Sequence, residues 1–74
     1  MKHTEFWAAL DYAFPEGRGR ALSADLVLPG LESQTAQEAL DNGVPPLRVW
    51  HEIISEMQLP QDFIYLHRKL ERKD

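Results

Sequence analysis

Apolar positions near the start of the chain recur with the period of an α-helix. Four large side chains form one stripe, in which the adjacent pair at its start is followed three or four positions later by the third and four further by the last: Phe6, Trp7, Leu10 and Phe14. Such a stripe is typical of a helix that buries one face. Thr4 is placed to be its N-cap, and Pro15 stops it. The pattern therefore predicts a first helix from Thr4 to about Phe14.

The next segment predicts a loop followed by a second helix. Residues 15–19 (PEGRG) combine proline with two glycines, a composition typical of a connector. Residues 20–28 place Leu22 and Leu26 one helical turn apart, and Pro29-Gly30 follows as a stop. We therefore expect a second helix over residues 20–28.

A third, short helix has clear signals at both ends. Thr35 and Glu38 have the spacing of a capping box, in which each side chain accepts a hydrogen bond from a free N–H of the first turn. Asn42-Gly43 supplies a left-handed stop, and Val44 is placed to pack back onto the helix.

Two further helices complete the pattern. Pro45-Pro46 predicts the start of a fourth helix, and Pro60 that of a fifth. The fourth has an inner stripe flanked by two further apolar residues: Trp50, Ile53 and Met57, with Val49 and Ile54. The fifth has three inward positions: Phe63, Leu66 and Leu70. Because no alternating strand pattern occurs, the sequence predicts an all-α fold, a compact bundle of about five short helices in a single domain, residues 1–74.

The segment 35–57 resembles a helix-turn-helix. That motif has a small residue in its first helix, a glycine four positions later and an aliphatic residue six beyond that, and this chain has all three: Ala39, Gly43 and Val49. Residues 46–57 would then be the recognition helix. Only Arg48 and His51 suit DNA contact there, whereas Glu52 and Glu56 would repel phosphate. We therefore favour plain helical packing for this pair over direct DNA contact.

The composition supports a folded protein with an acidic middle. The chain has 74 residues, 43% of them hydrophobic and 27% charged, and no cysteine. This excludes a disordered chain and a disulfide framework. Residues 32–62 carry six carboxylates against Arg48 alone, whereas the segment from His67 onward is net basic. Acidic Glu5 and Asp11 interrupt the N-terminal stretch before a secretory signal or membrane span can develop, so we expect a cytoplasmic protein.

No catalytic, metal-binding or cofactor-binding constellation is evident. His51-Glu52 begins a metalloprotease-like pattern, but Ser55 stands where the second histidine is needed. The residues suited to contact nucleic acid or a partner are cationic or titratable and lie in three places: Arg18 and Arg20, Arg48 and His51, and Arg68, Lys69, Arg72 and Lys73. We expect no enzyme activity, no metal and no cofactor.

Several motifs in one order resemble a known family. They are the opening MKHTEFW, the ADLVL of residues 24–28, and the run containing Thr35, Glu38, Ala39, Leu40, Gly43, Val49 and Trp50. Over about residues 1–60 the chain resembles short actinobacterial proteins catalogued as a domain of unknown function. Members are often encoded beside the recombinase RecA and its regulator RecX, which suggests a link to DNA repair. Residues 61–74, which we expect to form a C-terminal helix with a fraying basic tail, extend past this resemblance.

Two functions follow as hypotheses. The first is a non-enzymatic interaction module that binds a protein partner or self-associates, because the chain is short, acidic and rich in large apolar residues. The alternative is a small DNA-binding protein that uses segment 35–57 together with the basic tail. The acidic middle of the chain favours the first.

Overall fold

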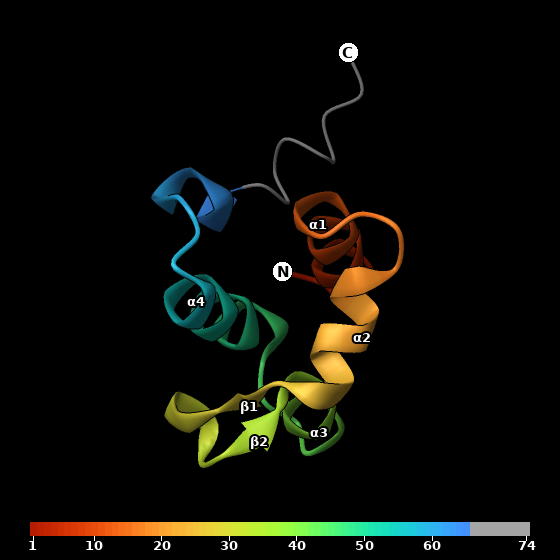
Figure 1. Ribbon diagram of the computed structural model, residues 1–74. Helices are drawn as coiled ribbons and strands as arrows, with labels where there is room; N and C mark the ends of the chain where they lie inside the picture. Colours follow the sequence, from red (N-terminus) through yellow and green to blue (C-terminus); the bar gives the residue numbers. More distant parts are fainter. Residues whose placement is uncertain (66–74) are drawn as a thin grey trace.

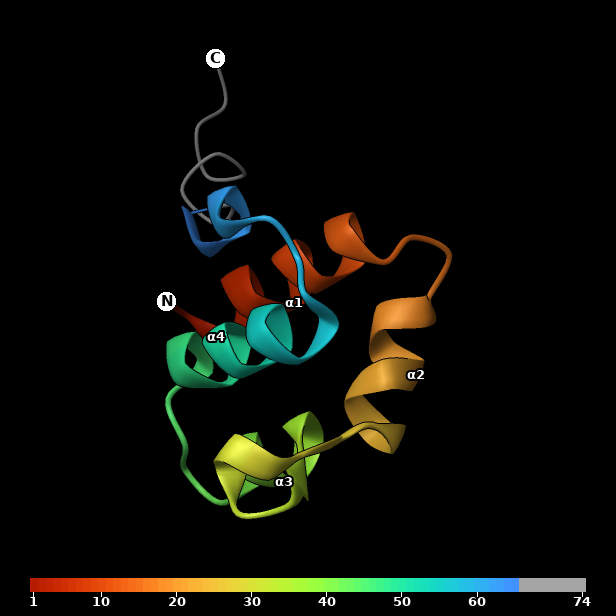
Figure 2. The same cartoon turned by 60° about the vertical axis from the view of Figure 1, so that its left-hand side comes forward.

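The computed structural model describes residues 1–65, which are mostly helical with one small sheet (Figure 1). Its elements in chain order are α1 (His3–Ala13), α2 (Arg18–Asp25), β1 (Val27–Leu28), the 3-10 turn η1 (Pro29–Leu31), β2 (Gln34–Thr35), α3 (Ala36–Asp41), α4 (Pro46–Met57) and the 3-10 turn η2 (Gln61–Tyr65). α1 and α4 lie side by side, and α2 runs down from α1 toward the sheet and α3 (Figures 1 and 2).

The first helix begins one residue earlier than predicted. α1 starts at His3, so Thr4 lies inside it and the expectation that Thr4 is the N-cap is wrong. The Glu5 side chain caps the start of the helix instead. Its Oε1 accepts a hydrogen bond from the Lys2 N–H at 2.6 Å, which gives that backbone donor a partner. The helix ends at Ala13 before Pro15, as expected.

The second helix is displaced toward the N-terminus. Gly17 adopts a left-handed φ of +78°, and α2 begins directly after it, so part of the expected loop is helical. The helix ends at Asp25 rather than at residue 28. Pro29 disfavours helical geometry at Leu28, and residues 27–28 form a strand instead.

The small sheet corrects the all-α prediction. β1 and β2 pair antiparallel, with Val27 opposite Thr35 and Leu28 opposite Gln34. Each strand has two residues, too few for an alternating pattern to be visible in the sequence. Leu28 and Leu31 from this hairpin are buried, so the sheet contributes to the core.

The signals at α3 are confirmed. Thr35 Oγ1 accepts from the Glu38 N–H at 3.2 Å, and Glu38 Oε1 accepts from the Thr35 N–H at 2.9 Å. Gly43 has a φ of +90°, and the Val44 N–H donates to the Ala39 carbonyl at 2.9 Å. Local chemistry therefore determines both ends of this short helix.

Helix α4 supplies the largest part of the core. It begins at Pro46 as predicted, and four of its side chains are buried: Val49, Trp50, Ile53 and Ile54. Met57 is 39% exposed, so its expected place on the inner stripe is wrong. Met57 is the last residue of the helix, and the chain turns away at Gln58, whose φ is +54°.

Trp50 joins three parts of the molecule. Its ring is fully buried and meets the Phe6 ring edge-on at 6.3 Å between centroids. Its Nε1–H donates to the Phe63 carbonyl at 2.8 Å, which holds η2 against α4. The predicted fifth helix is thus a 3-10 turn within the described residues, and Phe63 packs against the core as expected. Leu66 and Leu70 lie outside the described residues.

Candidate partner-binding surface

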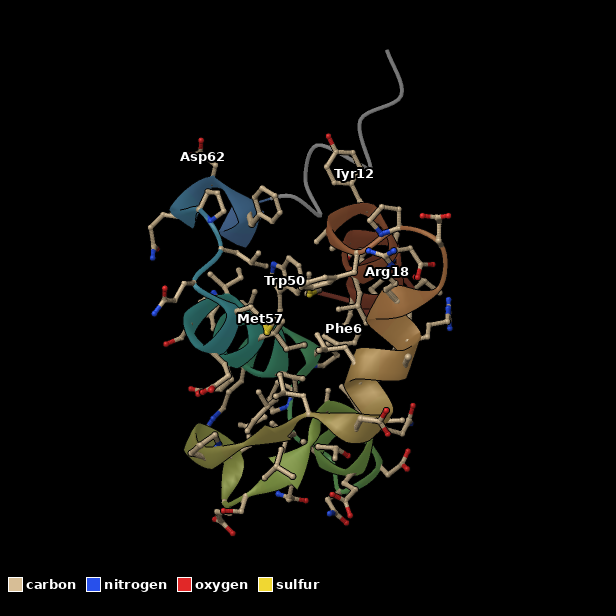
Figure 3. The ribbon with its side chains drawn as sticks, in the orientation of Figure 1. Phe6, Tyr12, Arg18, Trp50, Met57 and Asp62 are labelled. Carbon is tan, nitrogen blue, oxygen red and sulfur yellow. The ribbon has the colours of Figure 1, made fainter. Side chains whose placement is uncertain are left out.

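The structure places four of the eight predicted contact residues, all of them exposed. Arg18 and Arg20 lie in the first turn of α2, and Arg48 and His51 lie in the first half of α4. The other four lie outside the described residues: Arg68, Lys69, Arg72 and Lys73. Figure 3 shows Arg18 beside α1 and α2, across the molecule from α4. The three described arginines therefore do not form one basic face.

Arg20 is held in a cluster with two residues of α1. Its guanidinium lies over the indole ring of Trp7, 4.8 Å from the ring centroid. Its Nη2 also donates to Asp11 Oδ2 at 3.4 Å. Within residues 1–65 this is the one side-chain pair at salt-bridge distance. We refer to Trp7, Asp11 and Arg20 as the Trp7 cluster.

Two features of the packing build this cluster. Trp7 and Asp11 are four residues apart, so they lie on the same side of α1. The Phe6 ring meets the Trp7 ring edge-on, at 5.1 Å and 80°, which fixes the plane of the indole. Because one side of the indole is supported from within the protein, the ring presents a rigid aromatic surface to Arg20.

Gly19 brings Arg20 into position. Gly19 is buried in α2 against α1, and a Cβ there would lie 2.7 Å from Leu10 Cγ and 2.8 Å from the Leu10 carbonyl oxygen. Only glycine therefore permits this approach of the two helices without a shift. The next residue along the chain is Arg20, which the approach carries over Trp7.

The contacts of Arg20 are individually weak. The Arg20 and Asp11 side chains are 58% and 46% exposed, so solvent screens their attraction, and such pairs contribute about 0–1 kcal/mol. A cation over an exposed aromatic ring contributes about 0.5–1 kcal/mol. Thermal motion and competing ligands can therefore displace the guanidinium from the cluster.

The outer face of α4 is a second exposed surface. Arg48 and His51 lie one turn apart on it, next to Leu47, which is 36% exposed. Glu52 is half-buried, and its carboxylate lies so close to Gly30 that a Cβ on Gly30 would overlap it. Glu52 therefore faces the hairpin rather than the outer face, which changes the charge pattern expected for this helix.

The described surface is acidic and carries exposed apolar side chains. Residues 1–65 contain four Lys or Arg and ten Asp or Glu, a net charge of −6 with histidine neutral. Four large hydrophobic residues are exposed: Tyr12, Val27, Leu47 and Met57. Among residues 1–65, no group of three or more acidic or histidine side chains is placed to hold a metal ion.

Sequence reasoning named Arg20 but missed its two partners. Trp7 was assigned to the core stripe, and Asp11 was counted only as a charge. The spacing of an aromatic residue and a carboxylate by four positions could have marked one side of the helix. The third member comes from another helix through the contact at Gly19, which no local pattern reveals.

These observations define a small, mostly helical domain with an acidic surface and an exposed aromatic cluster. The chain belongs to the family described as proteins of unknown function (DUF3046), whose model matches residues 1–62. The predicted resemblance to a domain of unknown function is thereby confirmed. No curated protein and no solved structure matches the chain. In the described part, no helix has the length and apolar character needed to cross a membrane.

Proposed function

We propose that the protein is a non-enzymatic interaction module that binds a protein partner through the surface around the Trp7 cluster. The observation that carries this proposal is a half-buried indole that contacts Phe6 edge-on and has a weakly held arginine over its ring. Tryptophan and arginine are the residue types that most often dominate binding energy at protein interfaces. Both residue types are enriched at protein interfaces, which favours recognition over catalysis.

The charge of the domain indicates the kind of partner. The net charge of −4 over the full chain attracts a basic surface and repels nucleic acid at long range. The cluster contains an aromatic ring and a carboxylate paired with a guanidinium, groups that recognise a partner through stacking and charge. This composition supports binding rather than chemistry.

The proposal is tested by capture with the full chain from a lysate of the source organism, together with sedimentation of the purified protein. Asp11→Arg reverses a charge within the cluster and is expected to abolish retention of the partner. Asp41→Arg makes the same change in net charge on α3, at the other end of the molecule (Figure 1), and is expected to retain it. A strict monomer that retains no partner, or equal loss with both variants, would contradict the proposal.

A second candidate function is DNA binding through α4. It is favoured by one observation, the contact of the Glu52 carboxylate with the hairpin at Gly30, which draws one of the two repelling charges of α4 away from Arg48 and His51, while Glu56 stays exposed. In this case segment 35–57 acts as a helix-turn-helix, assisted by the basic residues after position 66. Electrophoretic mobility shifts at low salt, where electrostatic affinity is strongest, would compare the full chain with Arg48→Glu. No shift at low ionic strength eliminates this candidate.

A further inference from the structure

The Trp7 cluster already contains a ligand-like group, the guanidinium of Arg20. Within the described chain, this group has the two contacts that recognise an arginine side chain: an indole face at 4.8 Å and a carboxylate oxygen at 3.4 Å. The planar guanidinium suits stacking over a ring better than the compact ammonium of lysine. The site is therefore built for a guanidinium, whichever chain supplies it.

We infer that Arg20 occupies the binding position of an arginine from a basic protein partner, and that the partner's arginine displaces it. This inference rests on the proposed function and specifies the partner chemistry. Indole and carboxylate are positioned by α1 alone, so they stay in place when Arg20 swings away. Arg20, in contrast, reaches the cluster from α2 through a long, flexible side chain that is 58% exposed. Exchange of one guanidinium for another then requires no change in the backbone.

Charge explains why an external arginine can compete with an internal one. Arg20 belongs to the same chain as the cluster, so it loses little conformational freedom when it makes the contact. Exchange of its guanidinium for that of the partner's arginine therefore gives no gain in affinity by itself. A basic segment adds attraction to a protein whose full chain carries a net charge of −4. Arg20 then makes binding selective for basic segments, because a partner must offer more than a single arginine to displace it. It also covers the Trp7 ring when no partner is present.

A small probe tests the exchange directly. Acetyl-arginine amide is titrated into the 15N-labelled full chain, and the indole N–H signal of Trp7 is followed by NMR. Because the two weak internal contacts leave the cluster open for roughly 3–30% of the time, removal of Arg20 should raise the apparent affinity about three- to thirtyfold. Arg20→Ala is thus expected to bind the probe more tightly than the parent protein does.

Matched controls separate this effect from a change in net charge. Arg18→Ala removes the same charge two residues earlier in the chain and leaves Trp7 covered, so it is expected to bind the probe like the parent. Asp11→Asn in the Arg20→Ala background should reverse the gain, and acetyl-citrulline amide, which is neutral, should not bind. Far-UV circular dichroism of each variant verifies that the fold is retained.

The outcomes distinguish this inference from the proposed function. Equal affinity of Arg20→Ala and the parent, equal gains in Arg18→Ala, or equal binding of the citrulline probe would overturn the inference. If the inference is overturned but Asp11→Arg still abolishes capture of the partner, the proposed interaction function stands without the inference. If the probe binds Arg20→Ala as expected but the native chain captures nothing, the guanidinium site is supported and the interaction function fails.

Discussion

Replacement of Gly19 by alanine is expected to destabilise the protein even though alanine is the better helix former. Gly19 lies within α2, where the change alone would stabilise by about 1 kcal/mol. The new Cβ would lie 2.7 Å from Leu10 Cγ and 2.8 Å from the Leu10 carbonyl oxygen, whereas ordinary contacts are 3.4–4 Å. The carbonyl belongs to the backbone of α1 and cannot rotate away, so the two helices must separate.

The magnitude follows from the two opposing terms. Overpacking of a tight contact costs about 1–3 kcal/mol. Subtraction of the gain in helix propensity leaves a net loss of up to about 2 kcal/mol in the free energy of unfolding, measured by urea denaturation with far-UV circular dichroism. Ala24→Gly, at an exposed position of the same helix, measures the propensity term alone and should cost about 0.5–1 kcal/mol. If Gly19→Ala were more stable than the parent by about 1 kcal/mol, the close approach of α1 and α2 would be refuted.

Three further predictions use the same denaturation assay. Trp50→Ala should cost about 3–5 kcal/mol, because the side chain is fully buried. The whole stability expected for a domain of this size is about 4–11 kcal/mol. An unchanged urea midpoint would show that Trp50 is not in the core. Thr35→Ala should cost about 1 kcal/mol because it removes a capping bond, whereas Thr4→Ala should cost nothing, and equal losses would contradict the observed start of α1. Gly30→Ala should cost less than about 1 kcal/mol, because the atoms in the way of the new Cβ belong to the flexible Glu52 carboxylate. Glu52→Ala in the same chain should remove that cost. Additive effects of the two substitutions would argue against the contact.

The elements that could be predicted from sequence are those fixed by neighbours in the chain. The capping box of Thr35 and Glu38 and the left-handed Gly43 determine α3 locally, and both were recognised. The hairpin was missed because its strands are short and its loop folds by contact with α4. Leu31 reaches the core there, and Gly30 rests against Glu52. Such contacts join residues about twenty positions apart and leave no periodic trace.

The candidate surface also has one feature that the sequence predicts and one that depends on contacts between helices. Arg20 was predicted as a contact residue from its charge and its place near two glycines. That it lies over Trp7 depends on the separation of two helices, which one buried glycine controls. Met57 gives the opposite lesson, since its position in the helical period is correct but the helix ends there and no further turn covers it.

The unequal burial of the two tryptophans gives the protein two separate optical signals. Trp50 is fully enclosed, so its emission should lie toward the blue and resist soluble quenchers until the whole domain unfolds. Trp7 is only half-buried beneath the Arg20 guanidinium, so its emission should respond to quenchers in the native state. A Trp7→Phe and a Trp50→Phe chain would separate the two spectra. Unlabelled protein thus reports local events at the surface and global unfolding at different wavelengths.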